Sequence, residues 1–109
     1  MTTTADNHPG DHGTATASSG AATDAHVAGQ ITTESLSTAA GASYTLTITD
    51  PLVQADSVVL ASVALGSSTT GTPMVFTITP AAGSVVIKIY NNHASAAFNG
   101  TLVVSFIVF

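Results

Sequence analysis

The stretch Tyr44-Thr45-Leu46-Thr47-Ile48-Thr49 decides the fold class, because large apolar residues alternate with threonine along it. Successive side chains of a β-strand point to opposite faces of a sheet, so this alternation predicts a strand with one buried face and one wet face. Threonine suits the wet face because its branched Cβ favours an extended backbone. Asp50-Pro51 follows and ends the strand, since proline has no amide hydrogen to donate to a ladder.

Short segments of the same kind recur after residue 27, separated by glycine, proline, asparagine and aspartate. We expect strands at residues 30–33, 44–49, 57–65, 74–79, 85–90 and 101–109. The segment at residues 57–65 has apolar residues at both its odd and its even positions, which predicts a central strand. Asn99-Gly100 predicts a tight turn. No segment has the periodicity of a helix. This spacing of short strands predicts an all-β fold: an antiparallel β-sandwich or jelly-roll-like domain over residues 27–109, or a small barrel.

The last expected strand, residues 101–109, is apolar on both of its faces. These faces consist of Leu102, Val104, Phe106 and Val108, and of Val103, Ser105, Ile107 and Phe109. One face should enter the core, and the other needs a second cover, either a loop of the same chain or another subunit. A domain of about 80 residues buries only about 60–65% of its chain surface, so association would help to stabilise it. Val103, Ile107 and Phe109 are therefore candidate partner-binding residues.

Residues 1–26 differ from the rest, because Met1 is the one large apolar residue among them. The segment has no strand or helix periodicity, so we expect an extended N-terminal arm that is flexible alone and held by a neighbouring subunit. His8, Asp11 and His12 lie close together in it and are candidate partner-binding residues. Imidazole also binds metals, but this spacing in a glycine-broken segment matches no rigid site. We therefore expect no metal and no other cofactor.

The composition excludes several classes of protein. The chain has 109 residues, a net charge of -5, one basic residue (Lys88) and no cysteine, and only 6% of its residues are charged. A single cation cannot neutralise a run of phosphates, so we expect no nucleic-acid partner, and no anionic membrane surface. There is no apolar run of about 20 residues for a spanning helix, and the first residues lack the features of a signal peptide. A surface of threonine and serine with little charge suits a fixed assembly.

Few residues outside the arm could support catalysis. Glu34, Asp50, Asp56 and His93 are the acid–base groups, and both aspartates sit where they fit turns. The sequence has no nucleophile elbow and no phosphate-binding loop. We therefore expect no enzyme activity, and we expect Lys88 to face solvent or to form an ion pair.

Several stretches carry a resemblance to a known class of protein. They are Gly29-Gln30-Ile31-Thr32-Thr33, residues 41–48, residues 57–63, Gly71-Thr72-Pro73, residues 83–87 and residues 92–100. Together they make residues 29–109 resemble small structural proteins of tailed-bacteriophage virions. The resemblance implies a capsid decoration (cement) protein, which sits at joints between capsomers as a trimer or dimer. Residues 11–17 also resemble the N-terminal arm of lambda-type decoration proteins, which orders on the capsid.

Together these observations predict a virion structural protein on the outer capsid surface. It would bind the major capsid protein as a homo-oligomer, a trimer or a dimer, and reinforce the shell by bridging neighbouring capsid subunits. The alternatives are a fibre-tip or receptor-binding module and a neck or tail component. In a receptor-binding module, the loops at residues 67–72 and 91–99 would contact a host glycan.

Overall fold

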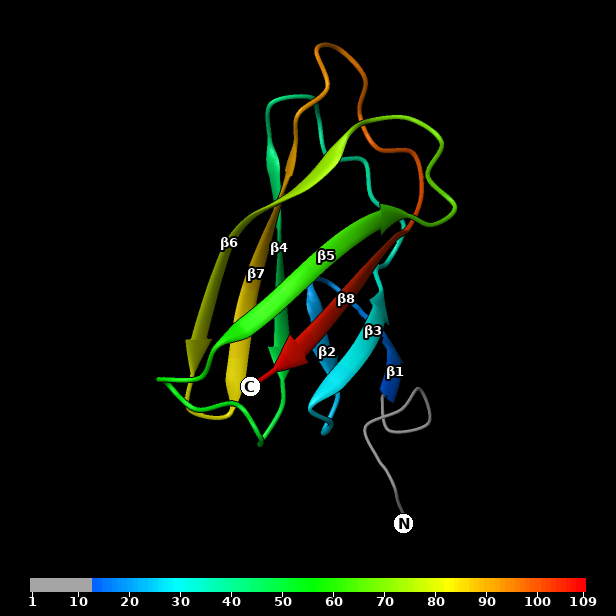
Figure 1. The fold of residues 1–109 in the computed structure, drawn as a ribbon. Helices are drawn as coiled ribbons and strands as arrows, with labels where there is room; N and C mark the ends of the chain where they lie inside the picture. Colours follow the sequence, from blue (N-terminus) through cyan, green and yellow to red (C-terminus); the bar gives the residue numbers. More distant parts are fainter. Residues whose placement is uncertain (1–12) are drawn as a thin grey trace.

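The computed structural model describes residues 13–109, which form two four-stranded β-sheets and contain no helix (Figure 1). The strands are β1 (Gly13–Thr16), β2 (Ala21–Thr23), β3 (Ala28–Thr32), β4 (Ser43–Thr49), β5 (Val59–Leu65), β6 (Pro73–Ala81), β7 (Ser84–Asn91) and β8 (Leu102–Val108). Sheet A has the order β1-β3-β8-β5, and sheet B has the order β2-β4-β7-β6. The all-β prediction is confirmed, and the two sheets have a sandwich-like arrangement.

The core lies between the sheets and is made by alternate side chains of the inner strands. On β4 the apolar residues Tyr44, Leu46 and Ile48 are buried, whereas Thr45 and Thr49 are exposed, as the alternation predicts. Strands β7 and β8 follow the same rule. The buried side chains on these strands and β3 are Ile31, Val85, Ile87, Ile89, Leu102, Val104 and Phe106. Each large apolar side chain so buried contributes about 1.5–3 kcal/mol, which makes this shared interior the main stabilising element.

Two strands lie inside the segment expected to be an unstructured arm, so that prediction is wrong for residues 13–26. Strand β1 pairs with β3 in sheet A, and β2 pairs with β4 in sheet B. Both pairings are parallel, so the sheets are mixed, and the expectation of a strictly antiparallel domain is also wrong. Residues 1–12, with His8, Asp11 and His12, lie outside the described residues, and an arm there stays a prediction.

The chain crosses from sheet A to sheet B between β1 and β2 through a tight turn. Ser19 and Gly20 adopt positive φ values of 52° and 78°, a conformation that glycine reaches without strain. The amide of Gly20 donates to the Glu34 carboxylate at 2.8 Å, and its carbonyl accepts from the amide of Thr47. Ala17 and Ala22, on either side of the turn, are buried. The segment is therefore part of both sheets.

Strand β5 lies at the edge of sheet A, which contradicts the expectation of a central strand. It pairs only with β8, and its free edge runs beside β6 (Figure 1). Strand β6 is the edge of sheet B, and it continues through Pro80 because an edge strand tolerates a missing amide hydrogen. The apolar character of both faces of β5 thus reflects a buried inner face and an exposed outer one.

The loops at one end of the sheets are tied together by Asn91, whose side chain is fully buried. Its Nδ2 donates to the carbonyls of Thr38 and Ala96, and its Oδ1 accepts from the amides of Thr72 and His93. One amide therefore joins three loops and leaves no polar atom of its side chain unsatisfied.

The predicted tight turn at Asn99-Gly100 is absent from the described structure. Asn99 instead accepts hydrogen bonds from Ser68 and Thr69 of the facing loop, and Gly100 forms an isolated bridge with Leu36. These contacts hold Asn99 and Gly100 in a loop that faces Leu36 and residues 67–69, in place of a two-residue hairpin turn.

Deleting residues 1–26 tests whether residues 13–26 belong to the folded unit. We expect the free energy of unfolding to fall by on the order of 3 kcal/mol or more, because each lost ladder hydrogen bond contributes about 0.5–1.5 kcal/mol. Urea unfolding followed by circular dichroism measures this loss. Deletion of residues 1–12 alone is the control, because it retains every contact described above. Equal stability of the two truncated chains would contradict the assignment.

Candidate functional site

The candidate partner-binding residues of the last strand lie on the outer face of sheet A. Val103, Ile107 and Phe109 point away from the core, opposite the buried Leu102, Val104 and Phe106. Ile107 is 39% exposed and Phe109 is 69% exposed. The structure thus confirms the division of this strand into an inner and an outer face. Among the described residues, no loop covers the apolar end of the outer face.

Strand β5 completes this face with residues that the sequence reading did not select. Leu60 stands opposite Ile107, and the amide of Phe109 donates to the carbonyl of Val58 at 2.8 Å. Leu60 is 55% exposed and Val58 is 59% exposed, so four large apolar side chains gather at one end of the β5–β8 pair. The sequence signal for this face is that residues 57–65 are apolar at both odd and even positions, a pattern that fits a central strand and an edge strand with an apolar outer face equally well.

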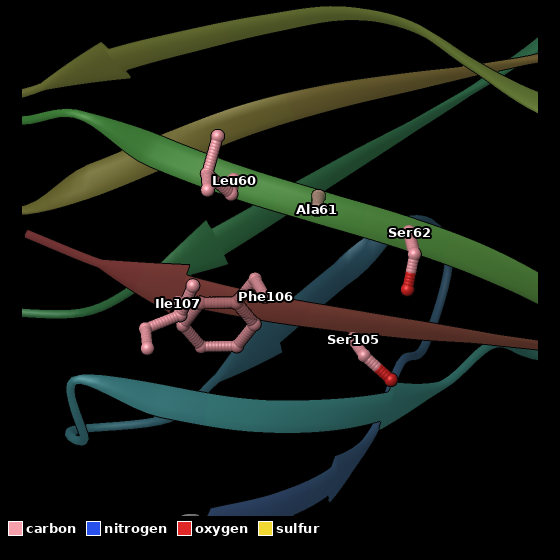
Figure 2. Close-up of a pocket in the computed structure, with 6 residues that line it drawn as sticks. All are labelled: Leu60, Ala61, Ser62, Ser105, Phe106 and Ile107. Atoms are coloured by element: carbon pink, nitrogen blue, oxygen red, sulfur yellow. The ribbon is translucent and has the colours of Figure 1, made fainter.

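A shallow depression of about 360 Å³ crosses the face between β5 and β8 (Figure 2). Leu60 and Ile107 flank it at one end, and the hydroxyl groups of Ser62 and Ser105 lie farther along the same two strands. Gln30 of β3 donates to the Ser105 hydroxyl at 3.5 Å. The depression is wide and open, so its shape suits contact with another protein surface better than the enclosure of a small molecule.

The outer face of sheet A carries no charged side chain within residues 13–109. Its members are Thr14, Thr16, Ala28, Gln30, Thr32, Val58, Leu60, Ser62, Ala64, Val103, Ser105, Ile107 and Phe109. The acidic side chains of the described chain are not on these strands: Asp24 and Asp50 are buried, Glu34 is hydrogen-bonded, and Asp56 is exposed in the loop before β5. The face can therefore be covered without desolvating a charge, which is the largest cost of burying a polar surface.

A cluster of acidic groups lies between the sheets near β1. Asp24 Oδ1 is 2.5 Å from His26 Nδ1, and the Asp24 side chain is only 1% exposed. The Asp24 carboxylate fits there because Gly13 and Gly29, which pair across β1 and β3 and face inward, have no side chains. An added Cβ at either glycine would overlap the carboxylate. Asp50 is also fully buried, and its Oδ1 accepts from the amide of Leu52. Burial raises the pKa of Asp50, and the charge of Asp24 adds to this effect.

Glu34 and His93, which the sequence also offered for catalysis, have structural contacts. Both oxygens of Glu34 are engaged, one by the Gly20 amide and the other by the Tyr44 hydroxyl, which donates at 2.9 Å. Burial and this hydrogen bond to Glu34 raise the pKa of Tyr44 well above its usual range. His93 Nδ1 accepts from two amides of its own loop, those of Ser95 and Ala96. These groups hold turns and loops in place.

The two loops that would contact a glycan in the alternative function bind each other. Thr70 Oγ1 donates to the carbonyl of Ala97, and Ser68 Oγ donates to Asn99 Oδ1 at 3.1 Å. Asn91 adds its bond to the amide of Thr72. Several hydrogen-bond donors and acceptors of these loops are thus used within the molecule, so fewer of them remain to bind a sugar.

The outer face of sheet B holds a second exposed apolar group. A β-bulge between Val75 and Thr77 leaves Phe76 62% exposed, and its ring centroid lies 6.0 Å from that of Tyr90. Lys88, two residues before Tyr90 on β7, is exposed and has no ion pair among the described residues, which agrees with the solvent-facing option. This face therefore differs from that of sheet A in having a pair of neighbouring aromatic rings and a cation.

No family model, curated protein or solved structure matches the chain. In the part of the chain that the structure describes, no group of three or more His, Asp or Glu side chains is placed to hold a metal ion. The same part contains no helix long and apolar enough to cross a membrane. The functional argument therefore depends on the surface chemistry.

The substitution Asp50→Asn should stabilise the protein at pH 7. The pKa of Asp50 is raised in the folded state, so folding favours its protonated form, and this contribution is lost as the pH rises through the folded pKa. Asparagine keeps an acceptor for the Leu52 amide and removes the buried charge. Thermal unfolding at pH 4 and pH 7 measures the effect.

We expect the melting temperature of the variant to exceed that of the wild type by a few degrees at pH 7, and by less at pH 4. Asp56→Asn is the matched control, because Asp56 is exposed and no gain is expected there. A loss of stability in Asp50→Asn at pH 7 would show that the ionised carboxylate is favourable in its site.

Proposed function

We propose that this protein is a structural component of a tailed-bacteriophage virion, specifically a decoration protein with a jelly-roll-like architecture and an N-terminal arm. It binds the major capsid protein on the outer surface of the shell and bridges neighbouring capsid subunits as a homo-oligomer. The proposal combines the resemblance of residues 29–109 to small virion proteins with the surface of the folded unit.

The observation that carries the proposal is the uncharged outer face of sheet A. A free protein of net charge -5 would be expected to keep charge on every face, because repulsion limits self-association. Here four exposed apolar side chains, Val58, Leu60, Ile107 and Phe109, lie on one sheet face with serine, threonine and alanine around them. Contiguous exposed apolar surface of this kind marks protein–protein contacts.

Bridging neighbouring subunits would strengthen a shell through many weak contacts. Each copy that touches two capsid subunits turns the second contact into an intramolecular event, so the effective affinity for the lattice exceeds that of either contact. Residues 1–12, which include His8, Asp11 and His12, would supply one of these contacts as an extended strand added to a neighbour's sheet.

Quantitative mass spectrometry of purified virions that carry this protein tests the proposal. We expect hundreds of copies per particle, in a fixed ratio to the major capsid protein, because a decoration protein repeats with the lattice. Particles that lack the protein should lose infectivity at a lower temperature than complete particles. A copy number of a few to dozens would contradict decoration and favour a fibre, neck or tail location.

A receptor-binding module is the second candidate, and the outer face of sheet B favours it. The exposed Phe76 ring, with the half-buried Tyr90 ring beside it, offers a surface on which a sugar can stack, and the exposed Lys88 ammonium on the same face can bind a carboxylate. Virions carrying Phe76→Ser should then adsorb poorly to cells while keeping the heat resistance of the wild type. Normal adsorption of these virions would remove this candidate.

A further inference from the structure

We propose that the outer face of sheet A is the contact surface for a second copy of this chain, in a two-fold stack of sheet A on sheet A. This inference rests on the proposed assembly role and names the partner of that face. The major capsid protein would then bind elsewhere on the molecule. The argument comes from the order of residue sizes along the face.

The register of the strands arranges the face in rows that run across it. One row consists of Ala28, Ile107 and Leu60; the next contains Gln30, Ser105 and Ser62; and the third contains Thr32, Val103 and Ala64. Beyond the first row lie Phe109 and Val58, and beyond the third lie Thr101 and Gly66. The larger apolar residues thus occupy one end, smaller residues with Val103 among them occupy the other, and a polar row lies between them.

A two-fold axis along the polar row makes this face complementary to itself. The rotation lays β8 on β8 and β5 on β5 in opposite directions, so the large residues of one end meet the smaller residues of the other end of the second copy. Leu60 then faces Ala64, Ile107 faces the smaller Val103, and Val58 faces Gly66, beside which the Thr101 hydroxyl lies. The Ser62, Ser105 and Gln30 side chains of the two copies meet at the axis, where they can exchange hydrogen bonds. A two-fold contact requires this kind of self-complementary patch.

The area of the face suits a weak dimer. At about 4.8 Å spacing, about 26 Å of strand on β5 and on β8, with five residues on β3 and four on β1, gives roughly 400 Å² per copy. The stack would bury about 800 Å² in total, which is in the range of weak, transient contacts. We therefore expect a reversible dimer in the micromolar range, which a lattice of further contacts would reinforce.

The charge distribution favours a second copy at this face over any other face. Two copies of an acidic chain repel each other, and exposed charges feel this within about 8 Å at physiological ionic strength. The outer face of sheet A is free of acidic groups among the described residues, and the buried Asp24 and Asp50 lie between the sheets. The contact therefore brings apolar and hydroxyl groups together without juxtaposing carboxylates.

Sedimentation velocity of the free full chain, without capsids, tests the inference. We expect a monomer–dimer equilibrium. The dissociation constant of the dimer should rise by about tenfold or more in Leu60→Lys and in Ile107→Lys, since each lysine would have to be desolvated in the stack. Thr45→Lys, on the exposed face of sheet B, adds the same charge and should leave the dimer unchanged. Circular dichroism checks that each variant is folded.

An isotope-filtered NOE experiment on mixed labelled and unlabelled wild-type protein tests the arrangement without any variant. Methyl contacts between Ile107 of one copy and Val103 of the other are expected. They cannot arise within one copy, where the two residues lie about 13 Å apart along an extended strand. Ile107-to-Ile107 contacts would instead contradict the proposed axis.

The inference is wrong if the wild type stays monomeric at millimolar concentration, or if both lysine variants of the face dimerise as well as the wild type. If the chain stays monomeric and Leu60→Lys instead stops binding to capsids, the face belongs to the shell. The proposed function would then survive while this inference fails. If the protein dimerises through this face but is absent from virions, this inference survives and the proposed function fails.

Discussion

The alternation of side chains along β8 is the constraint on which the rest of the structure depends. Leu102, Val104 and Phe106 fill the core, so Val103, Ser105 and Ile107 must point outward. Because β8 lies between β3 and β5, its outer residues lie within the face of sheet A and not at an edge. A one-residue slip would exchange the two sets, so the apolar outer face cannot be separated from the packing of the core.

The charges of the protein are arranged to leave that face free. Asp24 and Asp50 are buried between the sheets, and Glu34 accepts bonds from the Gly20 amide and the Tyr44 hydroxyl. These carboxylates support the fold at a cost in solvation, as the raised pKa of Asp50 indicates. Asp56 is then the one exposed acidic side chain of residues 13–109. The low charge of the sequence thus becomes an even lower charge at the folded surface, which is why we assign the molecule to an assembly.

The sequence was sufficient for the strands whose own pattern encodes them, and it failed where long-range pairing decides. The period-two patterns of β4, β7 and β8 predicted both the strands and their buried faces. Strands β1 and β2 carry only alanine, threonine and glycine, and they exist because β3 and β4 offer free edges for parallel pairing. For β5, residue parity gave the faces, but its edge position depends on strand order, which no local pattern contains. The Asp24 site depends on Gly13 and Gly29 being paired, which is again a matter of register.

The central claim is that the outer face of sheet A is covered when the protein functions. Hydroxyl-radical footprinting, with mass spectrometry of the free chain and of intact virions that carry it, tests this most directly. Phe109 is 69% exposed in the isolated chain, so it should be labelled there. The account predicts strong protection of Phe109 and Leu60 in the virion. Equal labelling of Phe109 in the two states would contradict it.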